Sequence, residues 1–302
     1  MKTISIIIPT YNEEENVLPI YDALREQLAA LEGRYGYEIL FIDNKSLDGT
    51  RDKILQLCAR DERVKAIFNT RNFGASNSSY YGALQTTGDC TIGMCADFQD
   101  PPELLPRMVE AWEQGHKIVA MVKTHSRENP LVRVLRTAYY RSLRRLSGLE
   151  MIEHFTSFAL YDKSALDVGR GWDDPEPFPR GMVAEYGLGI VTIPYTQPKR
   201  RAGKTSNHFF SLYDYAMLGV TRYTKLGARL ATFLGLLVSG ISFVAALVCL
   251  FVHREALPTL GLFCLGGIQM FFLGLLGEYV ISIQRRSMKR PLVFEERRVN
   301  FD

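Results

Sequence analysis

Residues 1–228 alternate short apolar runs with longer amphipathic segments. Runs such as SIIIP and ILFID are apolar throughout, which is typical of strands covered on both faces. The segments between the runs carry apolar residues at helical spacing. This pattern predicts strands over residues 4–9, 38–43, 64–68, 90–96 and 117–123, and helices over residues 14–31, 50–59, 75–86 and 102–114. Because strands and helices alternate, we expect an α/β fold with a parallel sheet.

Two uncharged apolar runs, residues 230–252 and 256–277, follow this region. Each is long enough to cross a hydrocarbon core, which needs roughly 20 helical residues. Since only residues 253–255 separate the runs, they predict a transmembrane hairpin with both ends on one side. The flanking residues Lys225, Arg229, Arg285, Arg286, Lys289 and Arg290 place that side in the cytoplasm by the positive-inside rule. A buried helical hairpin in a soluble core is the alternative.

Residues 130–147 combine a leucine-rich helical side with five arginines, a pattern that suits an interfacial helix on anionic lipid. A core helix with a solvated face is the alternative. Residues 209–223 predict a second interfacial helix that leads into the hairpin. The predicted organisation is therefore a catalytic domain (1–205), a juxtamembrane amphipathic helix (206–228), the hairpin (229–284) and a basic cytoplasmic tail (285–302).

Composition and the absence of certain motifs argue against several classes of function. The 302 residues carry 36 basic and 33 acidic side chains, a net charge of +3, which is too balanced to predict a nucleic-acid partner. Five scattered cysteines without a CxxC pair argue against structural zinc and a disulfide framework. The short apolar start turns acidic at once, so we expect no signal peptide. No GxGxxG or GxxxxGK[ST] motif supports dinucleotide or P-loop chemistry.

Polar segments follow four of the predicted strands. They are PTYNE (9–13), DNKSLDGT (43–50), NTRNFG (69–74) and ADFQDPPE (96–103). Each has a purely structural interpretation, such as helix capping by Asn12, Ser46 or Asp48. Ligands of open α/β sheets bind beyond the carboxyl ends of the strands, so four polar ends on one rim together predict a binding site.

At these residues the chain resembles the inverting family 2 glycosyltransferases of GT-A fold. It is most similar to the polyprenyl-phosphate group, which includes dolichol-phosphate mannose synthases and bactoprenol glucosyltransferases. The resembling segments are IIIPTYNEEENV, FIDNKSLDGT, NTRNFGASNSSYYGAL, ADFQDPPELL, FPRGMV and the predicted hairpin. The resemblance implies a Rossmann-like, mainly parallel GT-A domain with a C-terminal transmembrane hairpin. It also implies a multi-pass, homo-oligomeric protein of the cell (inner) membrane.

The implied reaction moves one hexose or N-acetylhexosamine from a nucleotide sugar, UDP-linked in our interpretation, to polyprenyl phosphate on the cytoplasmic face. The family pattern assigns nucleotide-sugar binding to Pro9, Tyr11, Glu13, Asp43, Arg71 and Asp97. A divalent cation, Mg²⁺ or Mn²⁺, would offset the charge of the leaving diphosphate. The family's Asp-x-Asp reads Cys95-Ala96-Asp97 here, so the ion is assigned to Asp97 and Gln99. We interpret Cys95 as a small buried residue at a strand end.

Basic residues complete the implied site. The segment QPKRRAGKTS (197–206) resembles the family's Arg-x-x-Gly-x-Ser/Thr loop, and we assign Arg201 and Lys204, together with Asp97, to catalysis. Lys123 and Arg136 are assigned to the acceptor phosphate. A solvated basic face is the alternative for each of these four basic residues.

A second departure from the family concerns the acceptor. Relatives often carry Gly-Asp-Phe-Arg-Leu where this chain has TSFAL, so Ser157 replaces a carboxylate and Ala159 replaces an arginine. A phosphate monoester is mostly dianionic at neutral pH and needs no general base, whereas an alcohol does. The replacement therefore favours a lipid-phosphate acceptor. The rival hypotheses are transfer to a hydroxyl of a lipid-linked glycan and an inactive nucleotide-sugar-binding scaffold.

Overall fold

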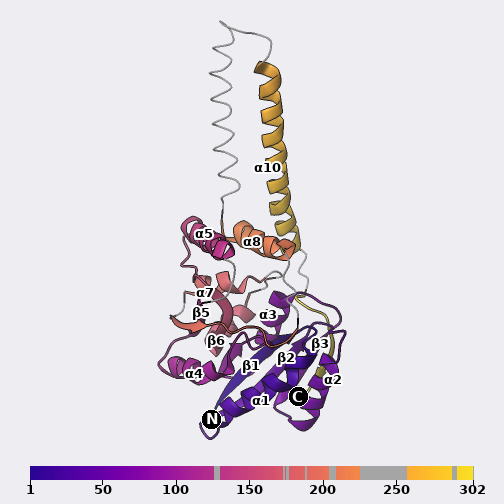
Figure 1. Ribbon diagram of the computed structural model, residues 1–302, viewed down its shortest axis with the longest axis vertical. Coiled ribbons are helices and arrows are strands. Elements are labelled where there is room, and N and C mark those ends of the chain that lie inside the picture. The colour runs from indigo at the N-terminus through magenta and orange to yellow at the C-terminus, as the bar shows by residue number, and fades with distance from the viewer. Residues whose placement is uncertain are drawn as a thin grey trace. The chain divides into compact units, whose positions relative to one another are not determined.

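The structure is a computed structural model that describes residues 1–125, 130–172, 174, 177–187, 189–203, 209–224, 257–287 and 291–301 (Figure 1). The chain divides into two compact units. The first comprises Met1–Arg141, Leu149–Asn207 and Lys289–Asp302, and the second comprises Ser142–Gly148 and His208–Met288.

Among the described residues of the first unit, eight strands form one sheet in the order β7-β5-β6-β4-β1-β2-β3-β8. Their bounds are β1 Lys2–Thr10, β2 Tyr35–Asp43, β3 Val64–Asn69, β4 Cys90–Gly93, β5 Ile118–His125, β6 Phe155–Asp162, β7 Ile190–Thr196 and β8 Glu295–Val299. The sheet is mixed, because β6 runs antiparallel to β4 and β5, and β8 runs antiparallel to β3. The expectation of a mainly parallel sheet holds only for the run β4-β1-β2-β3 and for the pair β5-β7.

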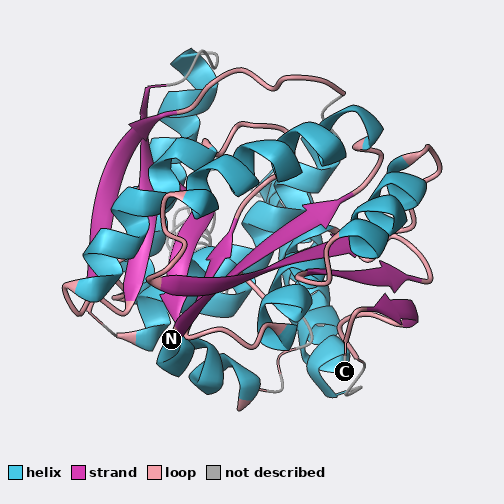
Figure 2. Cartoon of the chain, turned by 90° about the horizontal axis from the view of Figure 1, so that it is seen from below, coloured by secondary structure: helices cyan, strands magenta, loops and turns pink. Residues whose placement is uncertain are grey.

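Helices cover both faces of this sheet (Figure 2). Alternate side chains of a strand point to opposite faces. Ile4, Ile6 and Ile8 of β1 accordingly share a core with α1, α2 and α4, whereas Ile7 packs with α3 and α6 on the other face. The helices of this unit are α1 Glu14–Ala29, α2 Thr50–Arg60, α3 Ala75–Gln85, the 3₁₀ turn η1 Pro102–Leu104, α4 Leu105–Glu113, α6 Lys163–Arg170 and α7 Pro179–Tyr186. The helix α5 Pro130–Ser147 is divided between the two units after Arg141.

The predicted strands and helices up to residue 123 all form, with bounds within a few residues of those expected. Strands β6, β7 and β8 were not predicted. The strand β8 lies inside residues 285–302, which we expected to be a tail. The predicted helix 130–147 forms as α5 with the expected bounds.

The second unit contains α8 Phe209–Tyr223, with the predicted bounds, and the 31-residue helix α10 Leu257–Ser287. The hydroxyl of Tyr279 on α10 donates to the carbonyl of Thr224, at 3.1 Å. Apolar side chains are exposed along α10, among them Leu262, Leu273 and Ile283. The first predicted membrane run, residues 230–252, lies outside the described residues. In the part of the chain that the structure describes, no helix combines the length and the hydropathy needed to cross a membrane.

Candidate functional site

Asp43 is the buried centre of the rim formed by the ends of β1 and β2. Its carboxylate accepts hydrogen bonds from the backbone N–H of Ser46, at 3.1 Å, and from the Ser46 hydroxyl. Nε of Arg51 lies 3.5 Å from Asp43 Oδ2. Burial raises the pKa of Asp43 above its usual value, against the opposing effect of these partners. The carboxylate is therefore held in a fixed orientation at the strand end.

The loops after β1 and β2 are tied to each other. Asn12 has a left-handed backbone, with φ of 55°, and its side chain accepts from the N–H of Leu47 at 2.8 Å. The N–H of Asn12 donates to the Ser46 hydroxyl at 2.9 Å. Asn12 thus bridges two loops and does not cap α1, which corrects the capping interpretation of this residue. Asp48, in contrast, does accept from the N–H of Thr50 at the start of α2, at 3.1 Å.

Arg200 joins two carboxylates that come from different strand ends. Its guanidinium forms an ion pair with Glu13, and its Nη1 lies 3.4 Å from Oδ2 of Asp97. The side chain of Arg200 is 23% exposed, that of Glu13 is 12% exposed and that of Asp97 is 7% exposed. Their charges are therefore largely shielded from water. Burial raises the pKa of Glu13, although Asn16 and Arg200 act against that shift.

Backbone contacts fix the loop after β4 against the loop that carries Arg200. The N–H of Arg201 donates to the carbonyl of Asp97 at 3.1 Å, and the N–H of Gln99 donates to Asp97 Oδ1 at 3.0 Å. Phe98 between them has a left-handed φ of 63°. This tight turn aims the Asp97 carboxylate at Arg200.

Of the two basic residues that we assigned to the diphosphate, the structure describes only Arg201. Arg201 is exposed, with its guanidinium 5.1 Å from the ring centre of Phe98. Lys204 lies outside the described residues. Arg200, which was not among the predicted site residues, is the arginine beside Asp97. Its signal was present, since the Arg-x-x-Gly-x-Thr pattern starts at Arg200 and the required glycine, Gly203, has φ of 83°.

Two other residues predicted to bind the nucleotide sugar are exposed to solvent. Tyr11 is 36% exposed. Arg71 is also exposed, and its guanidinium lies 4.0 Å from the ring centre of Phe73. Phe73 in turn contacts Phe294, which precedes β8, with 6.0 Å between ring centres.

The buried Asn44 was not predicted as a site residue, yet it joins three segments at the rim. Its Oδ1 accepts from Nδ2 of Asn69 at 3.0 Å and from the Ser78 hydroxyl at 2.6 Å. The N–H of Phe73 also donates to it, at 3.3 Å. The residue therefore connects the ends of β2 and β3 with α3. Its position directly after Asp43 was the available signal.

Asp100 was also not predicted as a site residue. It lies in the loop after β4 and stabilises that loop. Its carboxylate accepts from the N–H of Cys95 at 2.9 Å and from the hydroxyl of Tyr195 at 3.3 Å. Burial raises the pKa of Asp100 to about 6. Cys95 itself is exposed, so our interpretation of it as a buried residue at a strand end was wrong: β4 ends at Gly93, and Cys95 lies in the loop.

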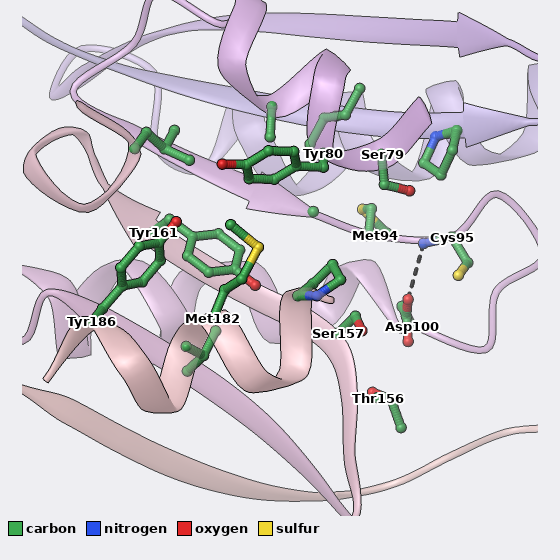
Figure 3. Close-up of a pocket in the computed structure, with 17 residues that line it drawn as sticks. Ser79, Tyr80, Met94, Cys95, Asp100, Thr156, Ser157, Tyr161, Met182 and Tyr186 are labelled. Carbon is green, nitrogen blue, oxygen red and sulfur yellow. Dashed lines mark hydrogen bonds between the residues drawn. The ribbon is translucent and has the colours of Figure 1, made fainter. Parts of the chain in front are cut away.

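A pocket opens beside this loop, with about 750 Å³ of empty space including the part open to solvent (Figure 3). Pro9, Cys95, Asp100 and Ser157 line it, together with apolar and aromatic side chains that include Tyr80, Met94, Tyr161, Met182 and Tyr186. Ser157 has a left-handed φ of 76°.

The two residues assigned to the acceptor phosphate belong to neighbouring elements. Lys123 lies on β5, where its N–H donates to the carbonyl of His154 at 3.2 Å. Arg136 lies on α5, but its side chain is outside the described residues. Their convergence on a phosphate therefore stays a prediction.

The site offers few protein ligands for a metal ion. Among the described side chains, no group of three His, Cys, Asp or Glu residues is arranged to hold one. Asp97 supplies a carboxylate and Gln99 an amide oxygen, which are hard donors suited to Mg²⁺ or Mn²⁺. These residues fit an ion that takes most of its other ligands from a bound diphosphate and water.

Known proteins resemble this chain over most of its length. Residues 5–169 match Glycosyl transferase family 2. The "Putative glycosyltransferase CsbB" of Bacillus subtilis (strain 168) is 30% identical over 95% of this chain and 89% of its own. The "Prophage bactoprenol glucosyl transferase homolog" of Escherichia coli (strain K12) is 29% identical over 95% of this chain and 96% of its own.

A solved structure shares the fold. The mannosyltransferase PcManGT from Pyrobaculum calidifontis, in complex with GDP-Man and Mn²⁺, matches with a TM-score of 0.50 and 16% identity, over 95% of this chain and 86% of its own. The mixed α/β sheet is thus of the GT-A type. The chain belongs to glycosyl transferase family 2.

Proposed function

We propose that the protein is an inverting glycosyltransferase that moves one hexose or N-acetylhexosamine from a nucleotide sugar to polyprenyl phosphate. The observation that carries the proposal is the meeting of Glu13, Asp97 and Arg200 at the carboxyl ends of β1 and β4. This place is where an open α/β sheet binds its ligand. Relatives named as bactoprenol glucosyl transferases support a polyprenyl-phosphate acceptor.

On the donor side, Asp43 accepts hydrogen bonds from the nucleoside, with Pro9, Tyr11, Glu13 and Arg71 around it. Asp97 and Gln99 would hold Mg²⁺ or Mn²⁺. The bound ion supplies positive charge to the leaving diphosphate. Arg201 and Lys204 face the same diphosphate, and we add Arg200 because of its position beside Asp97. Mn²⁺ accompanies GDP-Man in the mannosyltransferase of similar fold, which supports a metal-dependent donor site.

On the acceptor side, Lys123 and Arg136 bind the lipid phosphate. Its oxygen attacks the anomeric carbon as the bond to the diphosphate breaks, with inversion. A phosphate dianion carries no proton that must be removed, so Ser157 can occupy the position of the family's carboxylate without loss of the reaction. Ser157 lines the pocket beside Cys95 and Asp100, which supports a place near the reacting groups.

We further propose that the second unit holds the enzyme at the cytoplasmic face of the cell membrane, as a multi-pass, homo-oligomeric protein. The two apolar runs of the sequence and the apolar side chains exposed along α10 support this proposal. Confinement to the surface that contains the acceptor lowers the entropic cost of bringing the reactants together.

The test is turnover by the detergent-purified full chain with undecaprenyl phosphate and Mn²⁺ or Mg²⁺. A panel of UDP- and GDP-sugars is offered, and the lipid product is scored by mass. Asp97→Ala should abolish the product, whereas Asp22→Ala, an exposed carboxylate on α1, should not. Donor binding without a lipid product would favour a hydroxyl acceptor. An absence of both donor binding and turnover would favour an inactive protein over either transferase.

A further inference from the structure

The C-terminal strand β8 returns to the sheet and covers its edge beside β3. Arg297 pairs with Phe68 and Val299 pairs with Ala66. In Figure 1 the C-terminus lies beside β3 and α2. The strand β8 therefore pairs with β3, and β3 in turn pairs with β2. Asp43 is the last residue of β2.

Two adjacent glutamates of β8 have separate sets of partners. The carboxylate of Glu296 lies 2.7 Å from Nζ of Lys45 and 3.1 Å from Nη2 of Arg51. The carboxylate of Glu295 instead accepts from the hydroxyl of Tyr81 at 2.8 Å and pairs with Arg298. Successive side chains of a strand point to opposite faces, which explains why neighbours in sequence contact different elements.

Arg51 connects Glu296 to Asp43. Its Nη2 contacts Glu296 while its Nε lies 3.5 Å from Oδ2 of the buried Asp43. Its guanidinium also lies 4.8 Å from the ring centre of Phe68. The arginine is therefore held at three points, and its place beside Asp43 depends in part on the C-terminal strand.

Lys45 gives Glu296 a second connection to the same loop. Lys45 follows Asp43 by two residues and has a left-handed φ of 64°, a conformation that costs energy for a side chain of this kind. The ion pair with Glu296 offsets part of that cost. The loop that orients Asp43 is thus fastened to β8 on both sides of Ser46.

We infer that Glu296 is a positioning residue for the nucleoside of the donor, acting through Lys45 and Arg51 on Asp43. The inference rests on the proposed function, in which Asp43 accepts hydrogen bonds from that nucleoside. Isolated exposed ion pairs stabilise little, but two pairs that share one carboxylate form a network, and this network restrains the loop that carries Asp43. The C-terminal strand is then part of the donor site.

The experiment compares Glu296→Gln with Glu295→Gln in the full chain. Binding of UDP and of GDP, each with Mn²⁺, is measured by calorimetry, and the melting temperature of each variant is recorded. For the donor that turns over, KM and kcat are measured as well. We expect Glu296→Gln to weaken nucleotide binding and raise the donor KM about three- to tenfold, with kcat within about twofold. Glu295→Gln should leave both constants unchanged.

A double-mutant cycle adds a readout that a general loss of stability would not produce. Lys45→Met should weaken nucleotide binding in the same direction, and its effect should be smaller when Glu296 is already glutamine. Three outcomes would overturn the inference. They are an equal weakening of nucleotide binding by the two glutamate variants, additive effects in the cycle, and unchanged nucleotide binding in Glu296→Gln. A wild-type chain that binds neither nucleotide would instead overturn the proposed function, and the inference with it.

Discussion

Nη1 of Arg200 lies 3.4 Å from Oδ2 of Asp97. The same guanidinium pairs with Glu13, so one cation offsets two shielded carboxylates from different strand ends. Removing one partner of such a group leaves an uncompensated charge, which costs more than the pair itself contributes. The loop that supplies Arg200 is therefore coupled to the carboxylate that we assign to the metal.

Replacing Arg200 should impair transfer more than replacing its neighbour. Arg200→Ala removes this cation from Glu13 and Asp97, so we expect kcat/KM to fall by about a hundredfold or more, equivalent to about 3 kcal/mol. Arg201→Ala removes an exposed arginine that we also place at the diphosphate, and we expect a smaller loss than for Arg200→Ala. Steady-state kinetics with the donor that the panel assay identifies measures both. A deficit in Arg201→Ala as large as that in Arg200→Ala would contradict this ranking.

Asp100 should make stability depend on pH. Burial raises its pKa to about 6 in the folded protein, above the value of an unfolded aspartate. The folded state therefore binds the proton more tightly, and stability from this group is full at low pH and falls as pH rises from about 4 to about 6. Relative to Asp100→Asn, the wild type should lose on the order of 2–3 kcal/mol between pH 4 and pH 7. Urea unfolding at several pH values, followed by tryptophan fluorescence, measures the difference. A difference that stays constant across this range would show that the Asp100 pKa is not raised.

Asn44 should be a stability hotspot of the rim. Asn44→Ala removes the acceptor of Asn69 and Ser78 and leaves their buried donors without this partner. We expect the free energy of unfolding to fall by about 2–4 kcal/mol. Asn72→Ala is the matched control, because the side chain of Asn72 is exposed and accepts from the N–H of Gly74, and it should cost less than about 1 kcal/mol. Equal losses for the two variants would refute the proposed role of burial.

Ser157 should be dispensable as a base. If the acceptor is a phosphate, Ser157→Ala keeps turnover within about threefold, since no proton has to be abstracted. Ser157→Gly should raise stability by about 0.5–1 kcal/mol, because glycine adopts the positive φ without strain. Turnover assays and thermal melts check the two expectations. A loss of activity beyond about thirtyfold in a folded Ser157→Ala would place its hydroxyl in the chemistry.

Periodicity alone was sufficient for the elements of residues 1–123 and for α5 and α8. Local patterns decide these because an apolar run must be buried and an amphipathic segment must turn one face inward. The sequence also predicted the polar rim, because polar residues that follow parallel strands meet at one edge of the sheet. Strand β8 was not predicted, because its sequence EERRV has neither an apolar run nor alternating apolar residues. It forms by pairing with the edge of β3 rather than by burying side chains of its own.

The sequence by itself determined the family, the order of the first elements and the polar rim that contains Asp43 and Asp97. Only the tertiary structure decided which arginine meets Asp97, that Cys95 is exposed, and that Glu296 lies near the Asp43 loop. These choices depend on contacts between residues far apart in the chain, such as Glu13 with Arg200 and Lys45 with Glu296. A local pattern records which side chains are charged, but the partner of each charge is set by the packing of distant segments.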